Sequence, residues 1–333
     1  MKTQKYSIKK DGFYGLYFPV EDTAKKKGAA RKKAEKKHAT ESGTAGSSAI
    51  ILMLGDSPED TLAKAGAKWF LKHGISVMTM SPEKKDYGHH NYPLERIGAA
   101  IRVLQDKGHT NIGIAGLSTT GMVALTAASF YPELSLTIAM SASDFVMEGF
   151  YQDNLDGAHE RPGDGTESSL SWKGEPLPFL QYAYRHPEHW EKISAESKAT
   201  GNMVAARGMF DESERRNPVS EDARIKVENI KGHIVFIGAE DDALWDTCKY
   251  TRRMVEVLQK NPGSATFDAL LYEHGTHFVL PATMLTDLLP VGITAFVALA
   301  FKEGRKHPLA CKKTREDIDE KLTAILKTWK ANA

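Results

Sequence analysis

The sequence Asn111-Ile-Gly-Ile-Ala-Gly-Leu-Ser-Thr-Thr-Gly121, with the mostly apolar run that follows it to Phe130, decides the fold of this chain. The apolar residues before the serine predict the end of a buried strand, and the apolar pattern after Gly121 predicts a helix packed back on a sheet. Between them lies a sharp strand-to-helix turn with Ser118 at its tip. Small residues flank the serine, as expected where a turn brings the strand and helix backbones close together.

This turn is an imperfect form of a motif that carries catalytic serines. A G-x-S-x-G elbow exposes the serine hydroxyl above the sheet in the α/β-hydrolase fold. Here Thr120 occupies the fifth position, and the glycine comes one residue later. An ordinary strand-to-helix turn with an exposed serine fits this motif equally well. Whether Ser118 is catalytic therefore depends on residues elsewhere in the chain.

Composition and charge restrict the class of protein. The 333 residues are enough for one large α/β domain or two smaller ones. With 41% hydrophobic residues, 26% charged residues and a formal net charge of +1, neither nucleic acid nor a membrane surface is an expected partner. The two cysteines, Cys248 and Cys311, give no disulfide framework, and the N-terminus has no signal-peptide pattern. We therefore expect a cytoplasmic protein.

Strands and helices are expected to alternate along most of the chain. Residues 1–19 predict a β-hairpin joined to the core sheet, and residues 20–48 predict a mobile, basic insertion. Fully apolar strands separated by helices predict a mostly parallel central sheet, covered on both faces, from residues 49–144 and 225–304. Residues 305–333 predict a C-terminal amphipathic helix.

Residues 145–224 break this rhythm and are rich in Gly, Pro, His, Trp and Glu. Short helices are expected in this segment at Leu180–Tyr184 and His189–Ile193. A long insertion after the carboxyl end of a core strand is typical of a cap or lid over a site, and we favour that interpretation. A packing insertion with no ligand role is the alternative.

Two later strand ends supply the partners that a nucleophilic serine needs. Such a serine requires a base within hydrogen-bond reach and a carboxylate that orients the base. Asp241 and Asp242 follow the predicted strand that ends near residue 238, and His274 and His277 follow the next predicted strand. Serine, aspartate and histidine therefore follow three strand ends in the chain order of the α/β-hydrolases.

One residue of each pair is preferred. His277 is favoured over His274 as the base, because Gly-x-His followed by an apolar residue and a proline fits the usual loop. Asp242 is favoured over Asp241 as the acid. The other aspartate is then expected to cap the loop or to face solvent.

Two backbone amides are expected to stabilise the oxyanion that forms during attack. One is the amide of Thr119, directly after the nucleophile at the start of its helix. The second is expected from the loop after the first apolar strand, where we favour the amide of Asp56. Gly55 would allow the backbone to approach the substrate closely.

Several segments resemble the C-terminal domain of the acyl-CoA thioesterase and bile acid-CoA:amino acid N-acyltransferase family, which is dienelactone-hydrolase-like and belongs to the α/β-hydrolase superfamily. The most family-specific pieces are Ser143-Asp-Phe-Val-Met-Glu-Gly149 and Asp241-Asp-Ala-Leu-Trp245. Alignment on Trp245 is what favours Asp242 as the acid. The resemblance is to bacterial-type members, without the N-terminal immunoglobulin-like domain of the animal enzymes. Thr120 stands where the family usually has glycine.

The resemblance implies a serine hydrolase of fatty acid metabolism that cleaves acyl thioesters through a Ser-His-Asp triad and an acyl-enzyme. The family uses serine in its thioesterases and cysteine in its amino-acid-transferring enzyme, so Ser118 favours hydrolysis. Gly55, Phe145 and Trp245 are expected to contact the substrate. The alternatives are a carboxylesterase of the dienelactone-hydrolase type and an acyl-CoA N-acyltransferase. An inactive hydrolase-fold binding module is the alternative from another class.

No metal and no cofactor is expected. The histidines at 89–90 and 186–189 have no spacing that fixes a tetrahedral zinc site and are assigned to loops. No glycine-rich phosphate or dinucleotide fingerprint follows a strand. The expected partner is a small acyl thioester or ester, such as an acyl-CoA, and a homodimer is compatible with the sequence. The sequence does not fix the length of the acyl chain.

Overall fold

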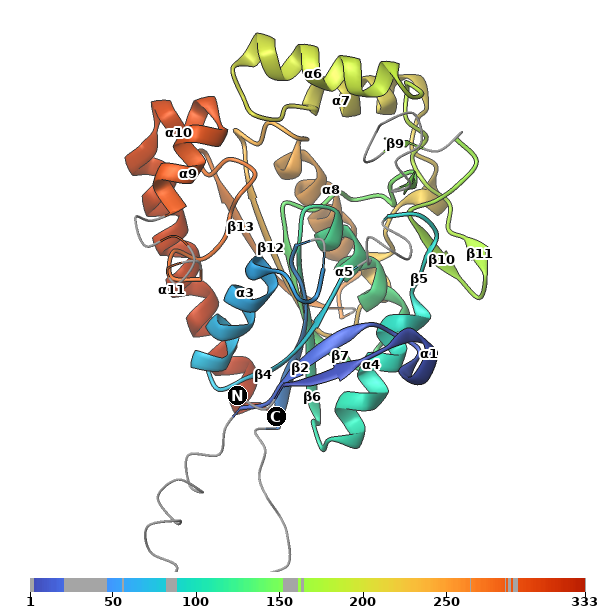
Figure 1. The fold of residues 1–333 in the computed structure, drawn as a ribbon, viewed down its shortest axis with the longest axis vertical. Coiled ribbons are helices and arrows are strands. Elements are labelled where there is room, and N and C mark those ends of the chain that lie inside the picture. Colours follow the sequence, from blue (N-terminus) through green and yellow to red (C-terminus); the bar gives the residue numbers. More distant parts are fainter. Residues whose placement is uncertain are drawn as a thin grey trace, which may run out of the picture.

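A mixed eight-stranded sheet forms the centre of the molecule, drawn from a computed structural model in Figure 1. The structure describes residues 3–20, 47–55, 57–81, 89–151, 161–162, 165–263, 265–284, 286, 289 and 293–332. The strands of the sheet are β1 (Gln4–Tyr6), β2 (Gly15–Phe18), β3 (Ser48–Met53), β4 (Ser76–Met80), β6 (Asn111–Leu117), β7 (Leu134–Met140), β12 (His233–Ala239) and β13 (Thr266–Tyr272). They lie in the order β1-β2-β4-β3-β6-β7-β12-β13. β2 is antiparallel to β1 and β4, and all pairings from β4 to β13 are parallel.

Helices cover both faces of this sheet, and each face has its own apolar core. The helices of one face are α4 (Glu95–Asp106), α5 (Thr119–Phe130) and α8 (Thr247–Lys260). The helices of the other face are α3 (Thr61–Lys72), α9 (Ile293–Ala300) and α11 (Pro308–Ala331). Within β3, Ile51 belongs to the first core and Ile50 to the second, because successive strand residues point to opposite faces. The mostly parallel sheet with helices on both faces confirms the predicted α/β-hydrolase fold.

The N-terminal segment differs in one detail from the predicted hairpin. A short helix, α1 (Ile8–Asp11), connects β1 to β2, and Gly12 ends it with a φ of 81°. This turn is helical because the Asp11 amide donates to the Ser7 carbonyl at 2.7 Å, while the Asp11 carboxylate accepts from the Ser7 amide at 2.8 Å. Of the insertion predicted at residues 20–48, residues 21–46 lie outside the described part of the chain.

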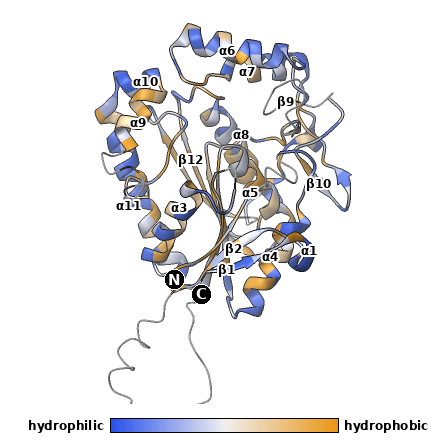
Figure 2. Ribbon diagram, viewed as in Figure 1, coloured by the Kyte–Doolittle hydropathy of each residue, from blue (hydrophilic) through white to orange (hydrophobic). Residues whose placement is uncertain are grey.

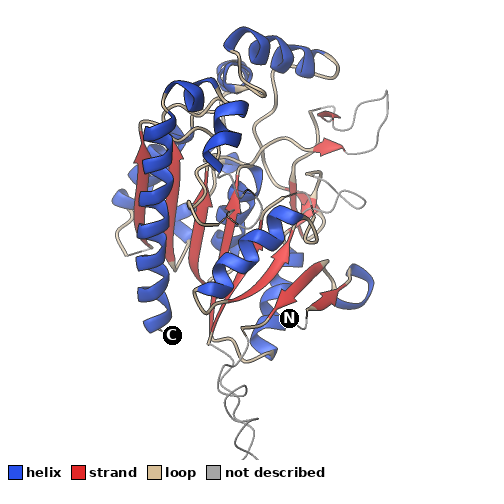
Figure 3. Cartoon of the chain, turned by 60° about the vertical axis from the view of Figure 1, so that its left-hand side comes forward, coloured by secondary structure: helices blue, strands red, loops and turns tan. Residues whose placement is uncertain are grey.

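The segment at residues 145–224 places two helices beyond the carboxyl ends of the parallel strands (Figures 1 and 3). These helices are α6 (Glu188–Thr200) and α7 (Arg207–Arg216). The expected helix at Leu180–Tyr184 is wrong. That stretch is not helical because the Leu180 amide donates to the Val146 carbonyl at 2.8 Å and the Tyr182 amide donates to the Glu148 carboxylate at 2.6 Å.

The remaining elements are short. They are the strands β5 (Tyr92–Pro93), β8 (Phe150–Tyr151), β9 (Arg161–Pro162), β10 (Leu170–Trp172) and β11 (Glu175–Pro176), the helix α10 (Lys302–Lys306) and the 3-10 helices Glu221–Ala223 and Val227–Asn229. Hydrophobic residues gather in the sheet and on the helix faces that meet it, whereas hydrophilic residues line the outer sides of the helices (Figure 2). Among the helices described, none combines the length and the apolar composition that a membrane span needs.

Candidate active site

Ser118 lies at the point where β6 turns into α5. Its φ of 64° and ψ of −131° are unusual for a residue other than glycine, and such local strain is typical of a nucleophile elbow. The surrounding backbone holds this conformation, because the Ser118 amide donates to the Met140 carbonyl at 2.8 Å and the Gly121 amide donates to the Ser118 carbonyl at 2.9 Å. The side chain of Ser118 lines a cavity beneath α6 and α7.

The glycines on either side of the elbow are required by close backbone contacts. A Cβ atom on Gly116 would lie 2.1 Å from the Thr120 carbonyl oxygen, and one on Gly121 would lie 2.8 Å from the Met140 carbonyl oxygen. Real Cβ atoms do not approach a carbonyl oxygen this closely. The pattern of small residues around the serine therefore has the steric cause that the sequence predicted.

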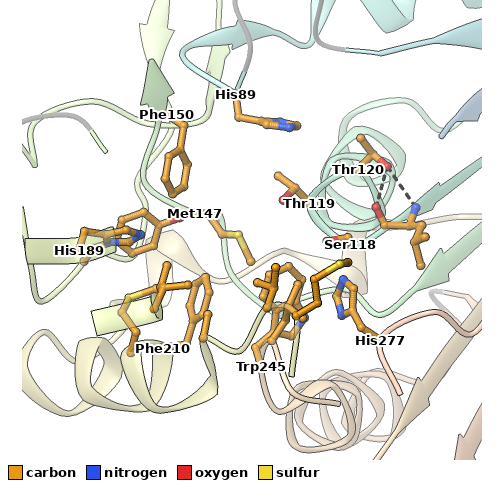
Figure 4. Close-up of a pocket in the computed structure, with 18 of the residues that line it drawn as sticks. His89, Ser118, Thr119, Thr120, Met147, Phe150, His189, Phe210, Trp245 and His277 are labelled. Carbon is orange, nitrogen blue, oxygen red and sulfur yellow. Dashed lines mark hydrogen bonds between the residues drawn. The ribbon is translucent and has the colours of Figure 1, made fainter. Parts of the chain in front are cut away.

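Thr120, the departure from the motif, is part of the hydrogen-bonding of the elbow. Its side chain is buried, and its hydroxyl lies 2.6 Å from the Met53 carbonyl oxygen at the end of β3. The same oxygen accepts from the Leu117 amide at 3.1 Å and lies 2.8 Å from the Leu117 carbonyl oxygen. Figure 4 shows the contacts between Thr120 and the end of β6. The threonine thus joins the elbow to the neighbouring strand.

His277 and Asp242 form a buried pair on the loops after β13 and β12. The Nδ1 atom of His277 lies 3.0 Å and 2.9 Å from the two carboxylate oxygens of Asp242. The two residues are 3% and 1% exposed. Nε2 of His277 is buried and has no hydrogen-bond partner among the described residues, and His277 lines the same cavity as Ser118. In Figure 4 the imidazole lies beside Ser118.

The carboxylate of Asp242 is fixed by two further donors. The Leu244 amide donates to Oδ1 at 2.9 Å, and the Thr247 hydroxyl donates to Oδ2 at 2.6 Å. Thr247 approaches because residue 238 is glycine, where a Cβ atom would lie 2.4 Å from the Thr247 methyl carbon. The sequence analysis missed this role of Thr247, and no spacing rule reveals it, since the contact depends on the path of the loop after β12.

Asp241 and His274 lie apart from this pair. Asp241 accepts from the amides of Gly275 and Thr276 at 2.9 Å and 2.7 Å and lies 3.3 Å from Nδ1 of His274. The ring of His274 stacks on that of His307, with centroids 3.9 Å apart. Thr276 has a φ of 62°, so these hydrogen bonds hold a strained turn directly before His277. Asp241 therefore shapes the histidine loop, and Asp242 contacts the imidazole.

Of the two backbone amides expected to bind the oxyanion, the structure describes that of Thr119 but not that of Asp56. Thr119 is the first residue of α5 and lines the cavity next to Ser118, where the amides of a helix N-terminus lack intrahelical partners. Asp56 lies outside the described residues. Gly55, directly before it, lines the cavity with a φ of 78°, and a Cβ atom there would lie 1.9 Å from the Asp60 carboxylate.

The cavity has a volume of about 420 Å³ and is lined mainly by apolar side chains. Trp245 lines it, packs edge-on against His277 with centroids 4.9 Å apart, and donates from Nε1 to the Ser141 carbonyl at 3.0 Å. The expectation that Phe145 contacts the substrate is wrong. It is fully buried against Tyr250 and does not line the cavity, because the strand end carries it into the core behind the site.

Neither cysteine is placed or activated as a nucleophile. Both are buried, and neither lines the cavity. Burial raises the pKa of Cys248 to about 12 and that of Cys311 to about 11, so both remain thiols at neutral pH. Within the described ranges, no group of three or more His, Cys, Asp or Glu side chains is arranged to hold a metal ion.

The sequence of residues 93–284 matches the family described as BAAT / Acyl-CoA thioester hydrolase C terminal. The chain belongs to this family. The matched range contains Ser118, Asp242 and His277, and the match confirms the resemblance found in the sequence. No curated protein matches this member of the BAAT / Acyl-CoA thioester hydrolase family along its sequence.

Solved structures with a similar chain path include several esterases. An esterase of Pyrococcus furiosus has 11% identity and a TM-score of 0.47, with 95% of this chain and 85% of that chain covered. The esterase domain of a Rhodothermus marinus protein has 12% identity and a TM-score of 0.42, with 93% and 98% covered. Est1E from Butyrivibrio proteoclasticus has 13% identity and a TM-score of 0.38, with 83% and 90% covered. These values are low, so the fold of this family member rests on its own sheet order.

Proposed function

We propose that the protein is a serine hydrolase that cleaves acyl thioesters through Ser118, His277 and Asp242. One observation carries the proposal: a serine on a strained elbow and a histidine line the same cavity. The buried Nε2 of this histidine has no hydrogen-bond partner in the described part of the chain, and its other ring nitrogen faces a carboxylate. Nucleophilic acyl transfer from a serine requires an imidazole base with one nitrogen held by a carboxylate and the other available to the serine hydroxyl.

In the proposed first step, Ser118 Oγ attacks the carbonyl carbon of the substrate while His277 Nε2 takes the hydroxyl proton. Asp242 keeps the Nδ1–H of the imidazole pointed away from the serine and stabilises the imidazolium that forms. The Thr119 amide donates to the oxygen that becomes negative. The tetrahedral intermediate collapses by breaking the carbon–sulfur bond, and His277 passes its proton to the leaving thiolate.

The proposed second step releases the acid. Water takes the place of the thiol, and His277 Nε2 removes its proton as its oxygen attacks the acyl-enzyme carbonyl. The second tetrahedral intermediate collapses by breaking the bond to Ser118 Oγ, which regains a proton from His277. One thioester and one water give one carboxylic acid and one thiol, and the enzyme returns to its starting state.

Two observations support a thioester with an apolar acyl group. Family membership supports acyl-CoA-type substrates, and the apolar lining of the cavity suits a hydrocarbon chain, because such a lining gives no compensation for a buried charge. The high pKa values of both cysteines support serine as the group that carries the acyl chain.

The proposal is tested by comparing purified wild type with Ser118→Ala on acyl-CoAs and p-nitrophenyl esters of matched chain length. The expected result is thioester hydrolysis that Ser118→Ala abolishes. Ser129→Ala is the matched control, because Ser129 lies near the C-terminal end of α5, bonds only to the Thr126 carbonyl among the described residues and does not line the cavity. Unchanged hydrolysis in Ser118→Ala contradicts the assignment.

The same assay separates the remaining activities. Hydrolysis of esters without hydrolysis of acyl-CoAs would identify a carboxylesterase. Formation of an amide product after addition of glycine or taurine would identify acyl transfer. If wild type cleaves nothing and a fluorophosphonate probe leaves it unlabelled, the fold is that of a binding module.

A further inference from the structure

A second imidazole lines the cavity from the cap. His189 lies in the first turn of α6, on the buried face that it shares with Ile193 and Ser197. Its side chain is 0% exposed and lines the same cavity as Ser118 and His277. In Figure 4 His189 lies on the opposite side of the cavity from Ser118, with apolar side chains between them. The mechanism proposed above does not use it.

Both ring nitrogens of His189 are buried. Neither ring nitrogen is hydrogen-bonded to any described residue. Burial is the main cause that lowers the pKa of His189 to about 4, and Arg185 lowers it further. An interaction with the Tyr184 backbone, too long or too bent for a hydrogen bond, opposes the fall. The ring is therefore neutral at pH 7, with one N–H that can donate and one nitrogen that can accept.

The surroundings of His189 are aromatic. The rings of Tyr182, Trp190 and Phe150 lie around it, with centroids 5.1 Å, 5.3 Å and 5.6 Å away. The hydroxyl of Tyr182 is used elsewhere, since it donates to the Glu148 carbonyl at 3.3 Å. A buried polar group without a partner destabilises the protein, and native proteins contain few such groups.

The position of His189 is fixed by the chain before α6. Its amide donates to the Arg185 carbonyl at 2.9 Å, and the guanidinium of Arg185 pairs with the fully buried carboxylate of Glu148. Glu148 also accepts from the Tyr182 amide at 2.6 Å. This ion pair, whose carboxylate is buried and whose guanidinium is partly exposed, anchors the backbone before α6 and with it the place of His189 in the wall of the cavity, as hydrogen bonding to a ligand requires.

We propose that His189 is a specificity-determining residue that hydrogen-bonds a hydroxyl group on the acyl chain of the substrate. A hydroxyl both donates and accepts, so one such group satisfies a neutral imidazole through either nitrogen. The acyl chain is assigned to this side because the aromatic wall would strip water from a charged phosphate or nucleotide without compensation. The inference rests on the proposed function for the position of the scissile carbonyl at Ser118.

The test compares the dodecanoyl thioester with its monohydroxylated counterparts, which carry the hydroxyl at the β, mid-chain or terminal carbon. For at least one position, wild type is expected to prefer the hydroxylated substrate by about tenfold or more in kcat/KM, as one added hydrogen bond to a buried partner gives. His189→Leu is expected to reduce this ratio to one or below. His189→Gln, which keeps a donor and an acceptor, is expected to retain part of it.

Two results overturn the inference. One is a wild-type kcat/KM for the hydroxylated substrate that is equal to or lower than that for the plain substrate at every hydroxyl position, as expected if water alone satisfies the imidazole. The other is a ratio that His189→Leu leaves unchanged. Should His189→Leu fail to fold, judged by its thermal melt, His189→Phe takes its place, since it also removes both nitrogens and keeps a ring.

A binding measurement separates this inference from the proposed function. Calorimetric titration of Ser118→Ala with dodecanoic acid and the matching hydroxydodecanoic acids needs no turnover. Tighter binding of a hydroxy acid, lost in Ser118→Ala/His189→Leu, supports the role of His189 even if no thioester or ester is cleaved. Equal binding of plain and hydroxylated acids overturns the role of His189 and leaves the catalytic assignment to the hydrolysis assays.

Discussion

Replacement of Thr120 by valine removes one hydroxyl from the elbow at almost constant volume. The hydroxyl lies within hydrogen-bond distance of the Met53 carbonyl at 2.6 Å and accepts from the Leu117 amide at 3.1 Å, and the side chain is 6% exposed. Water therefore has little access to the groups that lose a partner. An unsatisfied buried polar group costs about 1–3 kcal/mol, so we expect Thr120→Val to lower the free energy of unfolding by about 1–3 kcal/mol.

Thr120→Ser is the matched control, because it keeps the hydroxyl and loses only a methyl group. It is expected to cost about 1 kcal/mol through lost apolar burial. Urea unfolding of wild type and both variants measures these values. Because the same hydroxyl joins the elbow to β3, kcat/KM on a thioester is also expected to fall more in Thr120→Val than in Thr120→Ser. A Thr120→Val protein as stable and active as Thr120→Ser would refute this reasoning.

Four further variants test other contacts. Asp242→Asn is expected to lower kcat by about 10³–10⁴-fold, because the amide favours the wrong imidazole tautomer. Asp241→Asn is expected to cost less than about tenfold, and steady-state kinetics showing the reverse order would exchange the two roles. Gly121→Ala is expected to lose about 1–3 kcal/mol in urea unfolding, since its Cβ would lie 2.8 Å from the Met140 carbonyl oxygen, and unchanged stability would contradict that contact. The pKa of His189 in the folded protein is lowered to about 4. As the pH falls, His189 is therefore protonated in the unfolded chain before it is protonated in the folded protein. We therefore expect the free energy of unfolding of wild type, relative to that of His189→Leu, to stay constant above about pH 6.5 and to fall by about 3 kcal/mol towards pH 4. A difference that does not change with pH would show that the imidazole protonates freely in the folded protein.

The sequence was sufficient for the fold because the fold depends on patterns that are local. Apolar runs such as Ile50–Leu54 have the length of buried strands, and the helices between them predict a parallel sheet. The elbow was found in the same way, since Gly116 and Gly121 mark close backbone contacts that only small residues permit. The short helix α1 was missed because a turn closed by one aspartate and one serine resembles a hairpin turn in sequence.

Residues whose roles depend on tertiary contacts were harder to predict. Phe145 follows a strand end, as site residues do, yet it turns into the core against Tyr250. Thr247 contacts Asp242 only because of the path of its loop. The helix predicted at His189–Ile193 is confirmed within α6, whereas the assignment of the histidines at 186–189 to a loop is wrong for His189. That His189 lines the cavity becomes visible only when the walls of the cavity are known.

In the proposed mechanism Ser118 is the nucleophile, and His277 activates it. The most direct measurement is peptide mass spectrometry of the purified protein after incubation with a fluorophosphonate and, separately, with a mixture of acyl-CoAs. We expect one adduct, on the peptide that contains Ser118, with labelling abolished in Ser118→Ala and strongly slowed in His277→Ala. An adduct on another residue, or equal labelling of Ser118→Ala, would contradict it.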